Sequence, residues 1–287
     1  MTQNISFLWN KPTDAGTWSG GDWVATGGLA LANLATQDPT ELARSTDADA
    51  ANTRFAIDVG TAPVQPFSMF AMLNHNGTTA AQWRIFGSEN ADGSDPLFDT
   101  GLVNMWVPTV VFGALPWGAF PWDGVDQSAY PGGTVAFQTL AAPVYCPHLF
   151  VEVSDEANPA GYFQAGRFMA GQAWQPADNM SYGVRIRNVD PSTVRRTRGG
   201  KRVVRQRPGY RRLDASFEHL TEEEAMGVAF EIDRQIGKRG DFLVVYDADD
   251  HPSLRFRRTL YASLVDTSDI VTQEGRYVWT FAAEEIT

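Results

Sequence analysis

The chain has 287 residues, of which 43% are hydrophobic and 20% charged, and its formal net charge at pH 7 is −11. This amount of apolar material is enough for one large or two medium globular domains, which excludes a chain that is disordered throughout. The single cysteine, Cys146, excludes a disulfide-stapled scaffold and a cysteine-rich metal site.

Neither a secretory signal nor a membrane span is expected. The N-terminus lacks a basic stretch followed by an apolar one. The 23 residues between Asp99 and Asp123 carry no charge and are numerous enough to cross a bilayer. However, Pro108, Pro116 and Pro121 interrupt them and would leave backbone groups unpaired in lipid. We therefore expect strands and a rigid apolar loop here.

The first part of the chain is typical of short strands separated by turns. A short helix is expected in the region Thr40–Asp49. Strands are predicted at Phe55–Gly60, Phe67–Leu73, Gln82–Phe86 and His148–Val153. Many strands with Gly, Pro, Asn and Asp turns between them predict a β-sandwich of the jelly-roll type.

A segment rich in proline and glycine, Leu115–Gly124, contains three aromatic residues, Trp117, Phe120 and Trp122. Rigid exposed aromatic side chains lose little entropy on binding, so they could stack on a sugar or fill a pocket of a partner. Alternatively, they pack over the end of the sandwich or into a subunit interface. The pattern favours the second interpretation.

The sequence shows no catalytic or cofactor motif. It has none of the common hydrolase, metalloprotease, phosphate-binding or dinucleotide-binding patterns, and its four histidines lack metal-ligand spacing. The carboxylates of Asp92, Asp95 and Asp99 could ligate calcium, but Asp-Gly and Ser-Asp-Pro are also ordinary turn sequences, which is the favoured interpretation. We expect no enzymatic activity, no cofactor and no metal.

Charge and tryptophan content both change near residue 180. Residues 1–180 contain 5 Lys/Arg and 17 Asp/Glu, whereas residues 181–287 contain 18 and 17. Eight of the nine tryptophans also precede residue 181. Because such a shift usually marks a boundary, we predict two domains, residues 1–178 and 179–287.

A basic segment follows this boundary. Between Arg185 and Arg212 there are eleven Lys/Arg and one acid, Asp190. At the centre of this segment, an arm at about 194–207, the candidate docking residues are Arg195, Arg196, Arg198, Lys201 and Arg202. The arm could contact nucleic acid phosphates or dock on an acidic protein surface. It has no aromatic residue to stack on bases, so we expect contacts between subunits and no specific nucleic acid.

The remaining elements predict one helix packed on an antiparallel sheet. The segment Thr221–Glu224 is a capping box, and five apolar residues follow at helical spacing: Ala225, Val228, Ala229, Ile232 and Ile236. Gly237 ends the helix. Strands are predicted at Arg212–Leu220, Phe242–Tyr246, Thr259–Leu264 and Tyr277–Phe281. An α+β or β-sandwich domain is the economical arrangement.

The stretch Ala50–Gly101 resembles galactose-binding-like, or discoidin-like, jelly rolls. The resemblance rests on Phe55–Gly60, Ala81–Ser88 and Pro96–Gly101. Many members of that superfamily bind glycans or lipids through loops at one end. The resemblance therefore implies a glycan-binding module that attaches to a host surface as an alternative function.

The whole chain also resembles tail-tip and baseplate structural proteins of long-tailed bacteriophages. The segments that carry this resemblance are Gly161–Gly171, Trp174–Asn179 and Gly275–Ile286. It implies that residues 179–287 form a tail-tube-like ring domain with one flanking helix, present in six copies in the virion tail tip. Its implied partners are tail tube and baseplate hub proteins. The order of the two domains is the reverse of that in familiar distal tail proteins.

Overall fold

The structure is a computed structural model that describes residues 4–106, 134–249, 252–273 and 275–286. The chain divides into two compact units. The sandwich unit contains residues 8–173 and 248–257, and the sheet unit contains residues 1–7, 174–247 and 258–287. Antiparallel strand pairs dominate both units, so the predicted mainly β class is confirmed. No helix within the described ranges is long and apolar enough to cross a membrane.

Two sheets make up most of the sandwich unit. The larger has the order β2-β4-β10-β6-β7, with β8 beside β6. Its strands are β2 (Thr17–Ser19), β4 (Phe55–Asp58), β10 (His148–Ser154), β6 (Gln82–Ser88), β7 (Pro96–Asp99) and β8 (Val103–Asn104). The second sheet contains β12 (Arg167–Gly171), β5 (Gln65–Leu73) and β9 (Val135–Cys146).

Smaller elements complete the unit. A two-stranded sheet joins β3 (Ala43–Arg44) to β11 (Gln164–Ala165). The short helices are η1 (Pro12–Ala15), η2 (Leu31–Ala35), α1 (Ala50–Thr53) and α3 (Pro252–Arg257).

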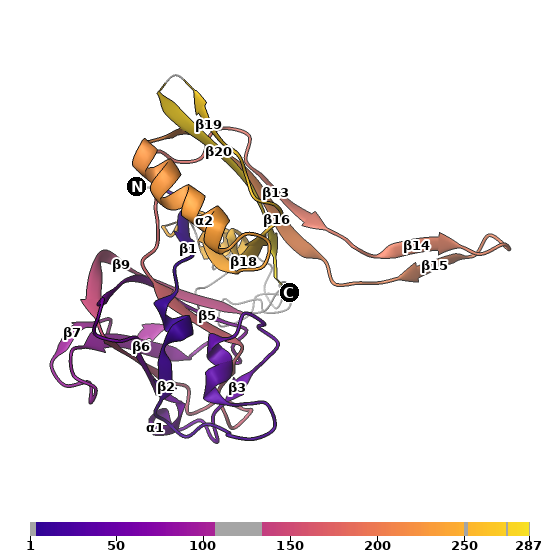
Figure 1. Ribbon diagram of the computed structural model, residues 1–287. Helices are drawn as coiled ribbons and strands as arrows, with labels where there is room; N and C mark the ends of the chain where they lie inside the picture. The colour runs from indigo at the N-terminus through magenta and orange to yellow at the C-terminus, as the bar shows by residue number, and fades with distance from the viewer. Residues whose placement is uncertain (1–3, 107–133, 250–251, 274, 287) are drawn as a thin grey trace, which may run out of the picture. The chain divides into compact units, whose positions relative to one another are not determined.

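Both sheets contribute to one hydrophobic core. In β10, Leu149, Val151 and Val153 are fully buried and the residues between them are not, which is the period of two that a half-buried strand requires. The core cluster also contains Trp83 from the larger sheet and Phe70 from the smaller one. The two sheets therefore pack face to face as a β-sandwich (Figure 1).

The four strands predicted in this half are confirmed as β4, β5, β6 and β10. The helix predicted at Thr40–Asp49 is wrong, because that region contains β3 and turns, and helix α1 begins only after it. Asp47 accepts a hydrogen bond from the backbone N–H of Asp49, and Asp49 accepts one from that of Ala51. Such local bonds offer the backbone an alternative to helix and place Asp49 as the N-cap of α1.

One seven-stranded sheet forms the sheet unit. Its order is β1-β17-β18-β20-β16-β13, and β19 pairs with β20. The strands are β1 (Ser6–Leu8), β17 (Phe242–Val245), β18 (Thr259–Leu264), β20 (Arg276–Glu285), β16 (Tyr210–Leu220), β13 (Arg185–Val189) and β19 (Ile270–Gln273). The four strands predicted in this half are confirmed as β16, β17, β18 and β20 of this sheet.

An aromatic core supports this sheet. Phe7, from the N-terminal strand, lies 5.4 Å from both Trp174 and Phe281, measured between ring centroids. Trp279 stacks on Phe281 at 4.8 Å and on Phe217 at 5.7 Å. The N-terminal strand and Trp174 thus belong to the sheet unit, so its sequence is discontinuous, unlike the predicted segment 179–287.

The predicted helix is present, and its first part is a π-helix. The π-helix η4 (Glu223–Ala229) continues into α2 (Phe230–Gln235). The capping box is confirmed: the Thr221 N–H donates to Glu224 Oε2 at 3.0 Å, and the Glu224 N–H donates to Thr221 Oγ1 at 3.3 Å. The residues that this helix buries are Ala225, Ala229, Ile232, Asp233 and Ile236.

Candidate functional site: a basic hairpin arm

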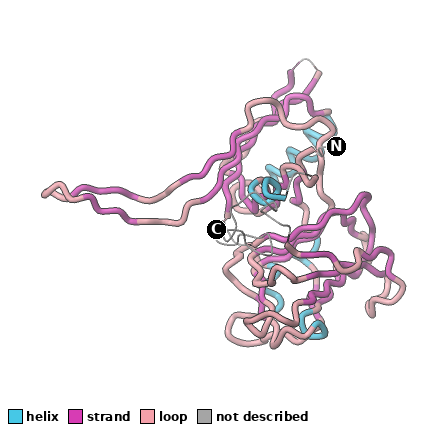
Figure 2. The backbone as a smooth tube through the Cα atoms, turned by 180° about the vertical axis from the view of Figure 1, so that it is seen from behind, coloured by secondary structure: helices cyan, strands magenta, loops and turns pink. Residues whose placement is uncertain are grey.

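A β-hairpin extends from the sheet unit between β13 and β16. It contains β14 (Thr193–Arg196) and β15 (Arg202–Arg205), which form a two-stranded sheet with each other. We call residues 190–209 the arm. Figures 1 and 2 show that the arm continues past the ends of β13 and β16 as a long two-stranded ribbon.

Two prolines separate the arm from the sheet. The ladder between β13 and β16 ends at Val189 and Tyr210. Pro191 and Pro208 follow this pair on the two strands, and neither has an N–H to donate to the ladder. The Ser192 hydroxyl then joins the strands, because it accepts from the Arg207 N–H at 3.0 Å and donates to the Arg207 carbonyl at 3.4 Å. The arm is therefore a two-stranded ladder of its own, separate from the ladder between β13 and β16.

The arm is exposed along its whole length. All 17 consecutive residues from Thr193 to Gly209 are exposed. They include Val194, Val203 and Val204, whose exposed fractions are 53%, 49% and 48%. A hairpin of two strands is at best marginally stable in water, since it has no third strand or helix to cover its apolar side chains. Burial against another surface would stabilise this arm.

The arm also carries charge that is not neutralised locally. It contains seven Lys/Arg and one acid, Asp190. No ion pair joins any of the seven cations to an acid in the described part of the chain. The side chain of Asp190 accepts from the Ser192 N–H at 2.9 Å, and hydrogen bonds from Ser192 lower its pKa. The arm is therefore a cationic surface.

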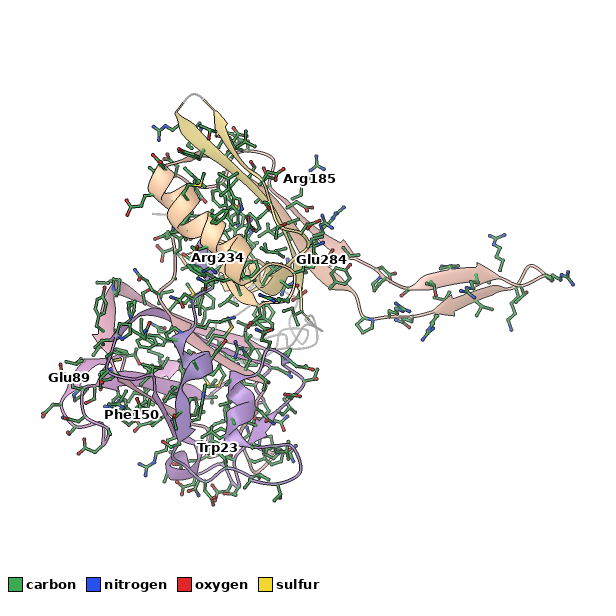
Figure 3. All side chains as sticks on the ribbon, viewed as in Figure 1. Trp23, Glu89, Phe150, Arg185, Arg234 and Glu284 are labelled. Atoms are coloured by element: carbon green, nitrogen blue, oxygen red, sulfur yellow. The ribbon has the colours of Figure 1, made fainter. Side chains whose placement is uncertain are left out.

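Arg211 and Arg212, which follow the arm on β16, form ion pairs, unlike the cations of the arm within the described residues. Arg212 Nε lies 2.8 Å from Asp214 Oδ1, and its Nη1 lies 3.2 Å from Glu284 Oε1. Arg211 binds the carboxylate of Glu285 through both its backbone and its guanidinium. Glu284 is labelled in Figure 3 on the sheet from which the arm extends. Arg211 and Arg212 thus have acid partners on the sheet, whereas the cations of the arm have none in the described part of the chain.

Each face of the arm combines valine with arginine. Val194 pairs with Val204 and Arg196 with Arg202. Because side chains alternate between faces along a strand, these four lie on one face. A surface hollow of about 370 Å³ lies along the arm, and its lining includes Val194, Arg202 and Val204. An apolar pair next to a cationic pair can contact an apolar surface that has acids beside it.

The predicted docking residues are brought together on this arm. Arg195 and Arg196 lie on β14, Arg202 lies on β15, and Arg198 and Lys201 lie in the turn between them. The pairing of the valines across the hairpin was not predicted. The sequence feature that could have predicted this pairing is a Val-containing run on each side of the Gly199-Gly200 turn.

The predicted aromatic contact residues, Trp117, Phe120 and Trp122, lie outside the described residues.

The acidic loop at residues 92–99 is occupied by turn and ion-pair contacts. Asp92 Oδ1 accepts from the N–H and the hydroxyl of Ser94 at 2.9 and 2.7 Å, and these bonds lower the pKa of Asp92. Arg84 binds Asp99, with Nε 2.9 Å from Oδ1, and lowers the pKa of that carboxyl. These contacts agree with the turn interpretation. Within the described ranges, no group of three or more His, Cys, Asp or Glu could hold a metal ion.

His75 and Cys146 are two of the buried titratable side chains of the sandwich unit. Neither ring nitrogen of His75 has a hydrogen-bond partner among the described residues, and burial lowers the pKa of His75 to about 3. Its ring packs edge-on against Trp106, with centroids 5.3 Å apart. Burial raises the pKa of the Cys146 thiol to about 12. Both groups are uncharged at neutral pH and act as core residues.

Comparisons with known proteins give a remote likeness only. No protein-family model and no curated protein matches the chain. Among solved structures, the chain is similar to chitosan-binding module 1 derived from a chitosanase/glucanase from Paenibacillus sp. IK-5, with a TM-score of 0.36 and 10% identity. It is also similar to CBM32-1 from a family 31 glycoside hydrolase from Clostridium perfringens, with a TM-score of 0.33 and 13% identity. Each likeness covers 57% of this chain and 99% of the other.

Proposed function

We propose that this chain is a structural subunit that joins a neighbouring copy through the arm. The observation that carries the proposal is the run of 17 exposed residues, Thr193–Gly209, whose cations have no acid partner within the described chain. The free hairpin is marginally stable, and docking covers its valines and neutralises its arginines together.

The distribution of charge favours a second copy as the partner. The sandwich unit contains 7 Lys/Arg and 18 Asp/Glu, which is a formal charge of −11, whereas the sheet unit contains 16 of each. The arm alone contributes +6 to the sheet unit, so the remainder of that unit is also acidic. A copy of this chain therefore offers acidic surface to the arm of its neighbour.

Nucleic acid is the competing partner for a cationic hairpin. Phosphate binding needs only charge, but single-strand binding commonly adds aromatic side chains that stack on bases. The arm contains no aromatic residue and instead presents three half-exposed valines. This composition favours a protein surface.

A contact between an arm on one side of the subunit and a different surface on the next is heterologous, and such contacts close into rings when the rotation allows. We place this ring in the tail tip of a long-tailed bacteriophage, in six copies, in contact with tail tube and baseplate hub proteins. This placement rests on the sequence resemblance of residues 161–171, 174–179 and 275–286 to such proteins.

Charge reversal on the arm tests the proposal. The variant Arg195→Glu, Arg196→Glu, Arg198→Glu should fall to the monomer mass in light scattering, with unchanged circular dichroism. A matched control, Arg54→Glu, Arg239→Glu, Arg276→Glu, changes the net charge equally at exposed sites and should retain the mass of the wild type. An arm variant that assembles like the wild type would overturn the proposal.

The same two variants decide between protein and nucleic acid. In fluorescence anisotropy with a labelled DNA duplex, the proposal predicts that the arm variant and the control bind equally weakly. Tight DNA binding that only the arm variant loses, with its assembly intact, would assign the arm to nucleic acid.

We propose glycan binding by the sandwich unit as a second function. It is favoured by the combination of a two-sheet sandwich with a Pro- and Gly-rich aromatic segment that contains Trp117 and Trp122. Trp117→Ala, Trp122→Ala should abolish retention on host-surface polysaccharide while the assembly mass stays unchanged. Unchanged retention would contradict this function.

A further inference from the structure

The outer face of the helix η4–α2 exposes two large apolar side chains. Met226 is 46% exposed and Phe230 is 50% exposed, and they lie four residues apart on the same side of the helix. Glu222 and Glu223, at the start of the helix, are also exposed. We call these four residues, with the exposed Gly227 between them, the helix patch.

The packing of the helix does not account for these residues. The helix fully buries Ala225, Ala229 and Ile232, whereas Met226 and Phe230 stay half exposed. Gly227 leaves open space on the patch, because a Cβ at that position would meet nothing closer than the Glu223 side chain at 4.0 Å. The patch is therefore an apolar surface with acids at one end and room for an approaching chain.

We propose that the helix patch receives the arm of a second copy of this chain. The inference rests on the proposed self-assembly and specifies the surface to which the arm binds. Val194 and Val204 lie against Met226 and Phe230, and Arg196 and Arg202 lie against Glu222 and Glu223. The apolar pairs exclude water at the centre of the contact, and the charged pairs fix its register.

The dimensions of the two surfaces agree. On the arm, the valine pair and the arginine pair are two residues apart along the strands, which is about 7 Å. On the helix, the two glutamates precede Met226 by three and four residues, which is less than one turn of the π-helix and a rise of about 5 Å or less. Long arginine side chains span the small difference.

The acids of the helix patch have fewer interaction partners than the acids near β7, where apolar side chains are also exposed. Leu97 and Leu102 are exposed in or near β7, but two acids of the same stretch of chain, Asp92 and Asp99, are held by Ser94 and Arg84. Glu222 and Glu223 take part in no ion pair within the described residues. An incoming arginine gains more from a carboxylate that has no cation beside it.

A charge exchange tests this pairing. Arg196→Glu, Arg202→Glu and Glu222→Arg, Glu223→Arg should each reduce the assembly mass to that of the monomer, and the four changes combined should restore at least half of the assembled fraction. The control Glu89→Arg, Glu156→Arg makes the same charge change at exposed acids of the sandwich unit and should assemble normally. Normal assembly of the helix variant, or no recovery in the combined variant, would overturn the inference.

Cysteine cross-linking tests the contact independently of how tightly the copies bind. A chain with Val204→Cys and a chain with Phe230→Cys, mixed and oxidised, should give a disulfide-linked dimer, since a disulfide forms only when Cα atoms come within about 7 Å. Cys146 is buried and does not compete. The control pairs Val204→Cys with Glu156→Cys. An equal or greater yield with the control would overturn the inference.

The two proposals fail differently. If Val204→Cys cross-links to the sandwich unit and the arm variant is monomeric, the arm still joins copies and only the helix patch is wrong. If the arm variant assembles like the wild type, the proposed self-assembly fails.

Discussion

Trp279 donates its indole N–H to the carboxylate of Asp233, with Nε1 3.1 Å from Oδ2. Asp233 is 8% exposed, and its Oδ1 has no hydrogen-bond partner within the part of the chain that the structure describes. Burial raises the pKa of this carboxyl. This hydrogen bond joins the helix to β20, but it requires the carboxylate of Asp233 to be buried away from water, which is unfavourable.

Asp233→Asn should therefore stabilise the protein at neutral pH. The amide oxygen still accepts from Trp279, and burying a neutral amide costs less than burying a carboxylate. We expect a gain of about 1 kcal/mol at pH 7, the low end of what a buried unsatisfied polar group costs. Urea unfolding gives the free energy, with Glu156→Gln as an exposed control. A less stable Asp233→Asn protein would contradict this account.

The gain in stability from Asp233→Asn should depend on pH. The unfolded chain releases the Asp233 proton at the ordinary pKa of an aspartate, whereas the folded protein holds it to higher pH. The wild type consequently loses stability as the pH rises through the interval between the two values. The advantage of Asp233→Asn should be smaller below this interval than at pH 7, as urea unfolding in acid and at pH 7 measures.

An ion pair joins the buried Arg167 to the half-buried Asp14 in the sandwich unit. Arg167 is fully buried on β12, its Nη2 lies 2.8 Å from Asp14 Oδ2, and its Nη1 donates to the Ala35 carbonyl at 2.5 Å. Removal of the acid leaves a buried cation, so Asp14→Ala should reduce the free energy of unfolding by about 3 kcal/mol. Asp14→Ala, Arg167→Met should recover part of this loss. A loss equal to that of the exposed Glu156→Ala would contradict the role of the pair.

The arm should be dispensable for folding. None of its residues from Thr193 to Gln206 is buried, so a chain in which Asn-Gly joins Ser192 to Arg207 should keep its Tm within about 2 °C of the monomeric variant Arg195→Glu, Arg196→Glu, Arg198→Glu, which also lacks the stabilisation that assembly gives. The same chain should no longer assemble. Calorimetry and light scattering on one preparation measure both properties, and a Tm far below that of the monomeric variant would show that the arm supports the fold.

Local sequence patterns predicted most strands and the capping box, because these depend on neighbours in the chain. They placed a helix at Thr40–Asp49, where side-chain bonds from Asp47 and Asp49 to the backbone produce turns instead. They also did not show that β1 joins the sheet of the second half. That pairing depends on Phe7 meeting Phe217 and Phe281, which are more than 200 residues away.

The candidate site was predictable only where it depends on residues that are neighbours in the chain. Clustered arginines are visible in sequence, so Arg195, Arg196 and Arg202 were identified. The register that pairs Val194 with Val204 requires the turn geometry, and the exposure of Met226 and Phe230 requires knowing which side of the helix faces the sheet. Apolar residues at helical spacing otherwise predict burial.

Cys146 should be chemically inert in the folded protein. Its thiol is buried and its pKa is raised to about 12, so almost no thiolate exists at pH 8. Ellman's reagent should detect no thiol in the native protein and one thiol per chain in guanidinium chloride. Rapid reaction of the native protein would contradict the described burial.

The solution mass of the wild-type protein tests the central claim most directly. Light scattering across a range of protein concentrations, with negative-stain images of the same peak, distinguishes a closed ring from a single chain of 31.6 kDa. Six copies give about 190 kDa, and this mass should fall in 1 M salt, where the screening length shrinks to about 3 Å. A mass of 31.6 kDa at every protein and salt concentration would contradict self-assembly through the arm.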